Sequence, residues 1–337
     1  MHEALHYTSR GQTVACRLCP KHCTIEEGQT GFCRTRQNTG GKLYALNYAQ
    51  ATGQALDPVE KKPLYHFYPG STILSLGTWG CNFACQFCQN WHIAQAQPAA
   101  AVLEPRAAAA LARQLVSRGN IGIAYTYSEP SVWYEYIWDT AALVRADGLK
   151  NVLVSNGFID PEPLAQLLPV IDAMNIDVKA FNDAFYQTVC AGRLEHVKRT
   201  IELAASRCHV EITTLLVTGL NDAVDELTGL AQWLAGISPD IPLHFSRYFP
   251  NYKMDAPPTP LSTLELAYKT ARRYLNYVYI GNVGGAGMNT YCPQCGYKVI
   301  DRSGGYSRLA TKPDEPGREK KCPECGRNIH ITGTVEF

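Results

Sequence analysis

The chain has no long hydrophobic run and carries little charge. No stretch of about 18 apolar residues occurs in its 337 residues, and no apolar segment follows Met1, so we expect neither a membrane span nor a signal peptide. Only 18% of the residues are charged, and the formal net charge of +1 gives no overall field that would attract nucleic acid or anionic lipid. We therefore expect a cytoplasmic protein that neither binds a membrane nor takes nucleic acid as its partner.

Cysteine, by contrast, is plentiful. The chain has 13 cysteines, and all but Cys190 and Cys208 fall into three clusters. Because the cytosol keeps thiols reduced, clustered cysteines there more often bind metal than form disulfides. The two separate cysteines are expected to be small buried hydrophobic residues. With 46% apolar residues, the chain can also bury a large core.

The middle of the chain alternates short apolar runs with helix-like stretches, which is typical of βα units around a parallel sheet. Strands are predicted at residues 73–76, 122–126, 151–155, 175–178, 210–217, 242–246 and 277–280. Helices are predicted at residues 105–117, 132–146, 161–168, 195–205, 224–234 and 261–275. Six or seven such units favour an α/β fold with an open or partial barrel over residues 71–285, flanked by a cysteine-rich extension at 1–70 and a tail at 286–337. Active-site groups should then collect at the carboxyl ends of the strands.

A loop with three cysteines follows the first predicted strand, in the pattern Cys81-x3-Cys85-x2-Cys88. Three close thiolates can bind three corners of an iron–sulfur cubane, whereas such cubanes usually take four cysteine ligands. One iron would then remain open for a small chelating molecule, as in catalytic rather than structural metal sites. The alternative is an ordinary zinc or electron-transfer site that His92 or a distant cysteine completes.

This loop, with the aromatic Phe87 directly before the last cysteine, resembles the hallmark of the radical S-adenosylmethionine (SAM) superfamily. More narrowly, the chain is similar to the pyruvate formate-lyase activating enzyme group, and most similar to the radical component of the AmmeMemoRadiSam system. The sequence segments that support this likeness are residues 57–67, 125–130 and 244–250. The resemblance extends from about Cys16 to Val283. It implies a partial (β/α)6 TIM-like barrel with a 4Fe-4S cluster on Cys81, Cys85 and Cys88.

The resemblance also implies an activity. The open iron would bind SAM, and an electron from a reductant such as flavodoxin or ferredoxin would cleave it to a 5'-deoxyadenosyl radical that takes hydrogen from a protein or small-molecule substrate. We favour a role with the other two components of the AmmeMemoRadiSam system. The alternatives are an activase that makes a glycyl radical on a partner protein and, in another class, an iron–sulfur and zinc-ribbon module for electron transfer or binding.

Polar residues at the ends of the next strands are candidates for binding the cofactor. By resemblance, Glu129 would accept from the methionine amino group of SAM, Ser155 and Asn156 would contact its ribose or methionine part, and Lys179, beside Asp177, would pair with its carboxylate. Each has an ordinary alternative: an N-cap for Glu129, a turn for Asn156, and a local ion pair between Asp177 and Lys179.

Three residues further along are weaker candidates for the same pocket. Glu211 shares one face of a strand with Thr213 by period-two spacing, so this polar pair can point into the barrel or lie exposed at an edge. His244 and Arg247 close the sixth strand and can face substrate, although a core histidine is a common alternative. The glycine-rich residues 281–287 lack the Gly-Lys-Ser/Thr ending of a phosphate loop, and they are expected to form a turn and linker.

The two flanking cysteine sets predict further metal sites. Cys292-x2-Cys295 and Cys322-x2-Cys325 match a zinc ribbon, in which four thiolates close a structural site, and a rubredoxin-like iron site would use the same ligands. Cys16, Cys19, Cys23 and Cys33 suit zinc or an auxiliary 4Fe-4S cluster, and a set without metal is the third possibility. The tail also carries basic residues that form a candidate docking surface: Lys298, Arg302, Arg308, Lys320 and Lys321.

Overall fold

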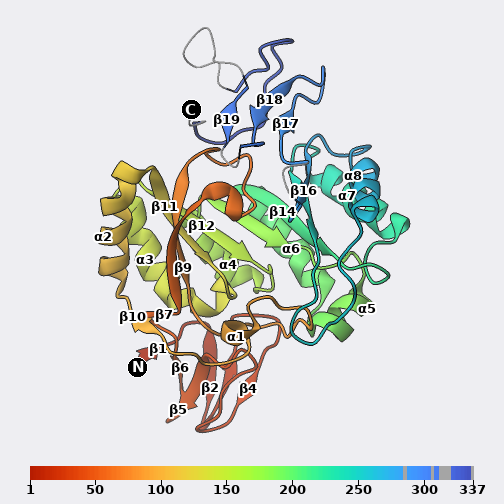
Figure 1. Ribbon diagram of the computed structural model, residues 1–337. Coiled ribbons are helices and arrows are strands. Elements are labelled where there is room, and N and C mark those ends of the chain that lie inside the picture. The colour runs from red at the N-terminus through yellow and green to blue at the C-terminus, as the bar shows by residue number, and fades with distance from the viewer. Residues whose placement is uncertain (284–286, 305–306, 311–319, 335–337) are drawn as a thin grey trace.

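A curved, mostly parallel sheet forms the centre of the computed structural model, which describes residues 1–283, 287–304, 307–310 and 320–334 (Figure 1). Its strands are hydrogen-bonded in the order β16-β15-β14-β13-β12-β11-β9-β8. The parallel strands are β9 (Thr72–Gly77), β11 (Asn120–Thr126), β12 (Lys150–Ser155), β13 (Ala173–Asp177), β14 (His209–Leu216), β15 (Leu243–Arg247) and β16 (Val278–Gly281). The edge strand β8 (Gly53–Pro58) is antiparallel to β9.

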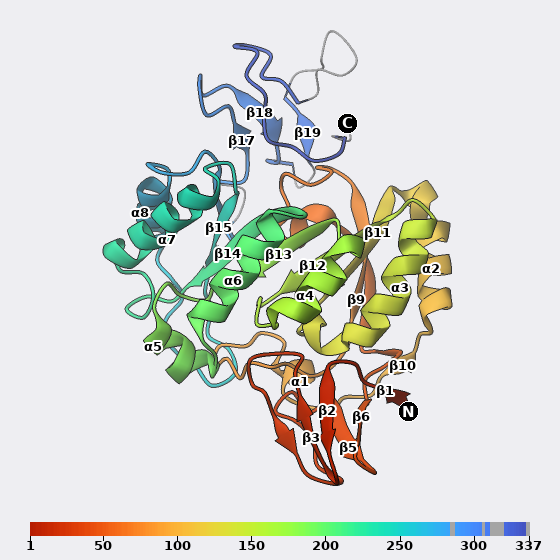
Figure 2. The ribbon, with the colours of Figure 1, turned by 180° about the vertical axis from the view of Figure 1, so that it is seen from behind.

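The helices that connect the parallel strands cover the outer face of this sheet. They are α2 (Pro105–Gln114), α3 (Tyr134–Ala146), α4 (Pro161–Leu167), α6 (Leu194–Ala205), α7 (Val224–Ile237) and α8 (Leu261–Ala271). Helices α4 and α6 lie behind the sheet in Figure 1 and in front of it in Figure 2. The sheet stays open between β16 and β8, and we call the sheet with its helices the open barrel, or barrel for short. The predicted α/β fold is confirmed. No helix in the described part of the chain is long and apolar enough to cross a membrane.

The sequence explains where these elements begin and why they are buried. Strands β9, β11 and β12 consist mainly of apolar or small residues that are buried on both faces, as expected for a parallel sheet covered by helices. Proline stands at the first position of α2 and α4, where its missing N–H costs no helical hydrogen bond. The predicted strands and helices overlap the observed ones, with ends that differ by a few residues.

The cysteine-rich N-terminal segment folds against the carboxyl ends of the strands, at the bottom of Figure 1. It forms two small antiparallel sheets: β1 (His2–Glu3), β6 (Lys42–Ala45) and β5 (Arg36–Thr39) in one, and β2 (Tyr7–Arg10), β3 (Thr13–Cys16) and β4 (Thr24–Ile25) in the other. Val14, Ile25 and Leu43 join the same buried cluster as the barrel core. Arg36 also donates to both carboxylate oxygens of Glu135 in α3, at 2.9 and 2.8 Å, and both side chains are buried.

Replacing Arg36 with methionine is expected to destabilise the protein by about 3–5 kcal/mol, because the change leaves the Glu135 carboxylate buried without its partner. Chemical denaturation followed by circular dichroism measures the loss. The double variant Arg36→Met/Glu135→Met should regain most of the stability, since it removes both charges. A single variant as stable as the parent would show that the pair does not anchor the N-terminal segment.

The tail packs against the opposite end of the barrel, beside the amino ends of the strands (Figure 1). Its sheet contains β17 (Thr290–Tyr291), β18 (Lys298–Asp301) and β19 (Arg308–Leu309). Ile300 and Ile331 share a buried cluster with Tyr279 of β16. Arg302, which we expected on a docking surface, is instead buried and donates to the Tyr65 carbonyl at 2.7 Å. The predicted boundary at residues 285 and 286 lies outside the described residues.

Candidate active site

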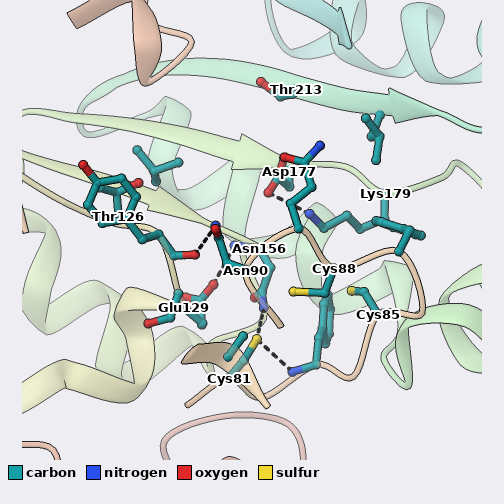
Figure 3. Close-up of a pocket in the computed structure, with 18 of the residues that line it drawn as sticks. Cys81, Cys85, Cys88, Asn90, Thr126, Glu129, Asn156, Asp177, Lys179 and Thr213 are labelled. Atoms are coloured by element: carbon teal, nitrogen blue, oxygen red, sulfur yellow. Dashed lines mark hydrogen bonds and ion pairs between the residues drawn. The ribbon is translucent and has the colours of Figure 1, made fainter. Parts of the chain in front are cut away.

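The three-cysteine loop lies at the carboxyl end of β9, as the sequence predicted, and its cysteines line one pocket of about 350 Å³ (Figure 3). This volume lies near the lower end of the range for small-molecule sites, about 300–1,000 Å³. The aromatic rings of Phe83 and Phe87 line the same pocket. Cys81, Cys85 and Cys88 therefore face a common space that is large enough for a small ligand.

Close packing holds this loop in place from both sides. Gly80 has φ +88°, and a Cβ atom at this position would lie 2.3 Å from Cγ2 of Thr35 and 2.7 Å from the carbonyl oxygen of Cys33, so only glycine fits. On the other side, the backbone N–H of Ala84 donates to the carbonyl of Cys190 at 2.9 Å. The loop is thus clamped between the N-terminal segment and the segment that ends at Cys190.

The chemistry of these cysteines suits a bound cation. Burial raises the pKa of Cys81 well above its ordinary value and also raises that of Cys88, so the free thiols would stay protonated. A metal that coordinates a thiol offsets this cost and holds it as a thiolate. Cys190 lies beside Cys85 but is not among the pocket-lining residues. The described residues that line the pocket therefore supply three cysteines and no fourth one.

Glu129 follows β11 and lines the same pocket as the three cysteines. Its buried carboxylate accepts hydrogen bonds from the Ser131 N–H at 2.9 Å, the Ser155 hydroxyl at 2.8 Å and the Asn156 N–H at 2.7 Å. The first of these is the N-cap that the sequence left as an alternative, and the same side chain also lines the pocket. Burial raises the pKa of Glu129, although the hydrogen bonds oppose this shift.

Asn156 connects the acidic and the sulfur side of the site. Its side-chain amide donates to the Asn82 side-chain oxygen at 2.9 Å. The same amide nitrogen lies 3.7 Å from the Cys81 sulfur (Figure 3). Ser155 does not line the pocket and instead positions Glu129. The ends of β11 and β12 thus form one hydrogen-bonded unit that reaches the first cysteine of the loop.

The end of β13 contributes an ion pair. Lys179 Nζ lies 2.7 Å from the Asp177 carboxylate, and both side chains line the pocket. Burial favours the neutral amine, but the Asp177 carboxylate and the nearby Cys85 and Cys190 together outweigh this effect and raise the pKa of Lys179. The lysine is therefore charged, and in this structure it makes the local pair rather than standing free.

Sequence reasoning missed the wall of the pocket near β8. Asp57 accepts from Lys62 Nζ at 2.8 Å, the Ser75 hydroxyl at 3.0 Å and the Tyr127 hydroxyl at 3.1 Å, while Lys62 and Tyr127 line the pocket. Burial would raise the pKa of Asp57, but these hydrogen bonds and the lysine charge lower it. The sequence did indicate that this region matters, because residues 57–67 form one of the segments that carry the family resemblance.

The structure places Glu211, His244 and Arg247 away from the pocket walls. Glu211 is near the amino end of β14, fully buried, and accepts from His244 Nε2 at 2.7 Å and from His209 Nε2 at 3.0 Å. Thr213, two residues later on the same face, does line the pocket, because it is one step closer to the carboxyl end. The side chain of Arg247 donates to the Thr259 carbonyl at 2.8 Å.

The tail contains a second metal-ligating group. Sulfur atoms of Cys292 and Cys325 are 3.6 Å apart, those of Cys295 and Cys322 are 3.5 Å apart, and all four lie within 4.8 Å of one another. A tetrahedral ion with metal–sulfur bonds of about 2.3 Å separates its sulfur ligands by about 3.8 Å. These four cysteines can therefore hold one metal ion.

Comparisons with known proteins identify the family of this chain. The model of the radical SAM superfamily matches residues 76–234. The uncharacterized protein MJ0808 of Methanocaldococcus jannaschii is 43% identical over 337 residues, which cover 98% of this chain and 99% of that protein. Molybdenum cofactor biosynthesis protein 1 of Homo sapiens is 28% identical over 180 residues, which cover 50% of this chain and 27% of that protein.

A solved structure shares the fold. Streptococcus suis SuiB bound to S-adenosylmethionine has a TM-score of 0.50 at 12% identity, over 72% of this chain and 61% of that chain. The matched family region contains the three-cysteine loop as well as Glu129 and Lys179. The chain therefore belongs to the radical SAM superfamily of enzymes.

Proposed function

We propose that this enzyme reductively cleaves SAM and uses the resulting 5'-deoxyadenosyl radical to take a hydrogen atom from a protein or small-molecule substrate. The observation that carries this proposal is that Cys81, Cys85 and Cys88 face one pocket without a fourth cysteine among its described lining residues. Three protein ligands suit a 4Fe-4S cluster with one open iron. When bound, the cluster supplies the electron that breaks the sulfonium bond of SAM.

The pocket residues would bind and orient the cofactor. Glu129 is a buried acceptor that suits the amino group of SAM, and Lys179 can turn from Asp177 toward its carboxylate. Asn156 fixes the distance between Glu129 and the Cys81 side of the pocket. Phe83 and Phe87 add apolar surface that keeps water away from a reactive radical.

The sequence resemblance supports a role for this enzyme in the AmmeMemoRadiSam system, with a reductant such as flavodoxin or ferredoxin. Lys62 belongs to the segment at residues 57–67 that carries this resemblance, and its side chain lines the pocket, as does that of Tyr127. The pocket wall near β8 would then face the substrate. In the tail we propose zinc, because a closed set of four thiolates suits a structural zinc ion.

The test is to purify the protein without oxygen, reconstitute it with iron and sulfide, and incubate it with SAM and a low-potential reductant. We expect 5'-deoxyadenosine to form only when both SAM and the reductant are present. A protein that holds a reducible cluster but leaves SAM intact would contradict the proposal and favour the electron-transfer alternative. Adding candidate glycyl radical partners to the same assay distinguishes the activase alternative, since a glycyl radical has its own electron paramagnetic resonance (EPR) signal.

A further inference from the structure

The four cysteines of the N-terminal segment line a single cavity. Cys16, Cys19, Cys23 and Cys33 all line one cavity, which they share with apolar side chains such as Leu18. Cys16 and Cys33 are buried, and the other two are half-buried. Four thiols that meet in this way, from positions spread over 18 residues of chain, form a candidate ligand set rather than isolated core residues.

The spacing of these sulfur atoms separates the possible occupants. In the tail, the four cysteine sulfurs all lie within 4.8 Å of one another, as a single metal ion requires. Among the described residues, neither the N-terminal four cysteines nor the three of the central loop include such a compact group. In a cubane each thiolate binds a different iron, so its sulfurs stand farther apart than around one ion. The N-terminal set shares its wider spacing with the central loop.

We infer that Cys16, Cys19, Cys23 and Cys33 hold a second 4Fe-4S cluster, distinct from the one proposed for the central loop. Four protein ligands saturate a cubane, so this cluster has no open iron and is closed to SAM and to substrate. Its surroundings suit an anionic cluster. Lys21 lines the cavity, and the backbone N–H of Phe32 lies 3.4 Å from the Cys23 sulfur as a hydrogen-bond donor. Arg36 also lines the cavity, although its charge is already paired with Glu135.

The position of this set relative to the central loop is defined by direct contact. The backbone carbonyl of Cys33 lies against Gly80, the residue directly before Cys81. Lys21 lines the N-terminal cavity and donates to the carbonyl of Ala191, directly after Cys190, whose own carbonyl anchors the central loop. A cluster held by the N-terminal cysteines would therefore lie directly behind the loop that carries the catalytic cysteines.

The test uses the full-length chain with Cys81, Cys85 and Cys88 changed to alanine, so that its result does not depend on the proposed activity. Iron, acid-labile sulfide and zinc are counted in protein prepared without oxygen, and Mössbauer and EPR spectra identify the iron species. We expect about four iron and about four sulfide to remain per chain, with a reduced EPR signal that added SAM does not change. An iron-free variant would overturn the inference, whether it holds zinc at the N-terminal site or no metal there.

Two further variants, made in the triple alanine variant, test whether a loss of iron comes from the missing ligands or from misfolding. Changing Cys295 to serine should remove the tail metal but leave the iron, while changing Cys16, Cys19, Cys23 and Cys33 to serine should remove the iron but leave the tail metal. The retained tail metal shows that the tail of the quadruple variant is folded. If that variant misfolds, the single change Cys23→Ser should still convert the cluster to a 3Fe-4S form with its own EPR signal. Unchanged iron spectra in Cys23→Ser would contradict the assignment.

Discussion

The triple variant Cys81→Ala/Cys85→Ala/Cys88→Ala should form 5'-deoxyadenosine from SAM at least about a thousand-fold more slowly than the parent, a loss of about 4 kcal/mol in transition-state stabilisation. The three thiols come from one loop and face one pocket. Alanine keeps the small size of the buried side chains but removes every sulfur ligand, so the central cluster cannot assemble. The measurement is the initial rate of 5'-deoxyadenosine formation under reducing, oxygen-free conditions.

Cys208→Ala is the matched control. Cys208 directly precedes β14, near the amino ends of the strands, and it is not among the residues that line the pocket or the N-terminal cavity. This variant should cleave SAM at the parental rate and should bind as much iron. If the triple variant keeps more than about a tenth of the parental rate, less than 1.4 kcal/mol has been lost, and the reaction does not depend on this loop.

Much of the barrel could be predicted because parallel strands leave a plain signal. Their residues are apolar on both faces and are bounded by turns, and Pro105 and Pro161 mark helix starts. The antiparallel strand β8 leaves no such signal, because its six residues combine Gly53, Asp57 and Pro58 with only two apolar side chains. The strands of the N-terminal segment have two to four residues each and depend on the barrel core for burial.

The candidate site could be predicted where residues follow directly on the strands. Glu129 and Asn156 meet at one end of the sheet, because parallel strands bring their carboxyl ends together. Lys62 reaches the pocket from the segment after β8, which only tertiary packing brings there. For Glu211, the period-two pattern predicts which face of the strand carries the side chain, but not how far along the strand it lies. The side chain lies beside His209 and His244, near the amino end of β14 and away from the pocket.

Glu129→Gln should lower kcat/KM for SAM by at least about 100-fold, a loss of about 2.7 kcal/mol, and should weaken SAM binding. The carboxylate accepts from the Ser131 N–H, the Ser155 hydroxyl and the Asn156 N–H. A glutamine side chain has one acceptor oxygen, and its amide group would face donors that the carboxylate satisfies. Hydrogen bonds to a charged group contribute about 1.5–3 kcal/mol each, so losing one of them and the charge accounts for the expected effect.

Two measurements and one control variant distinguish a role in SAM binding from a general loss of structure. Iron content should match the parent, because Glu129 is not a cluster ligand, while the Kd for SAM, measured on the reduced protein by EPR titration, should rise. Glu162→Gln on α4 is the control, since this glutamate is exposed and does not line the pocket, and it should leave both values unchanged. A Kd within about threefold of the parent, less than 1 kcal/mol, would mean that Glu129 only caps the turn after β11 and that the amino group of SAM is bound elsewhere.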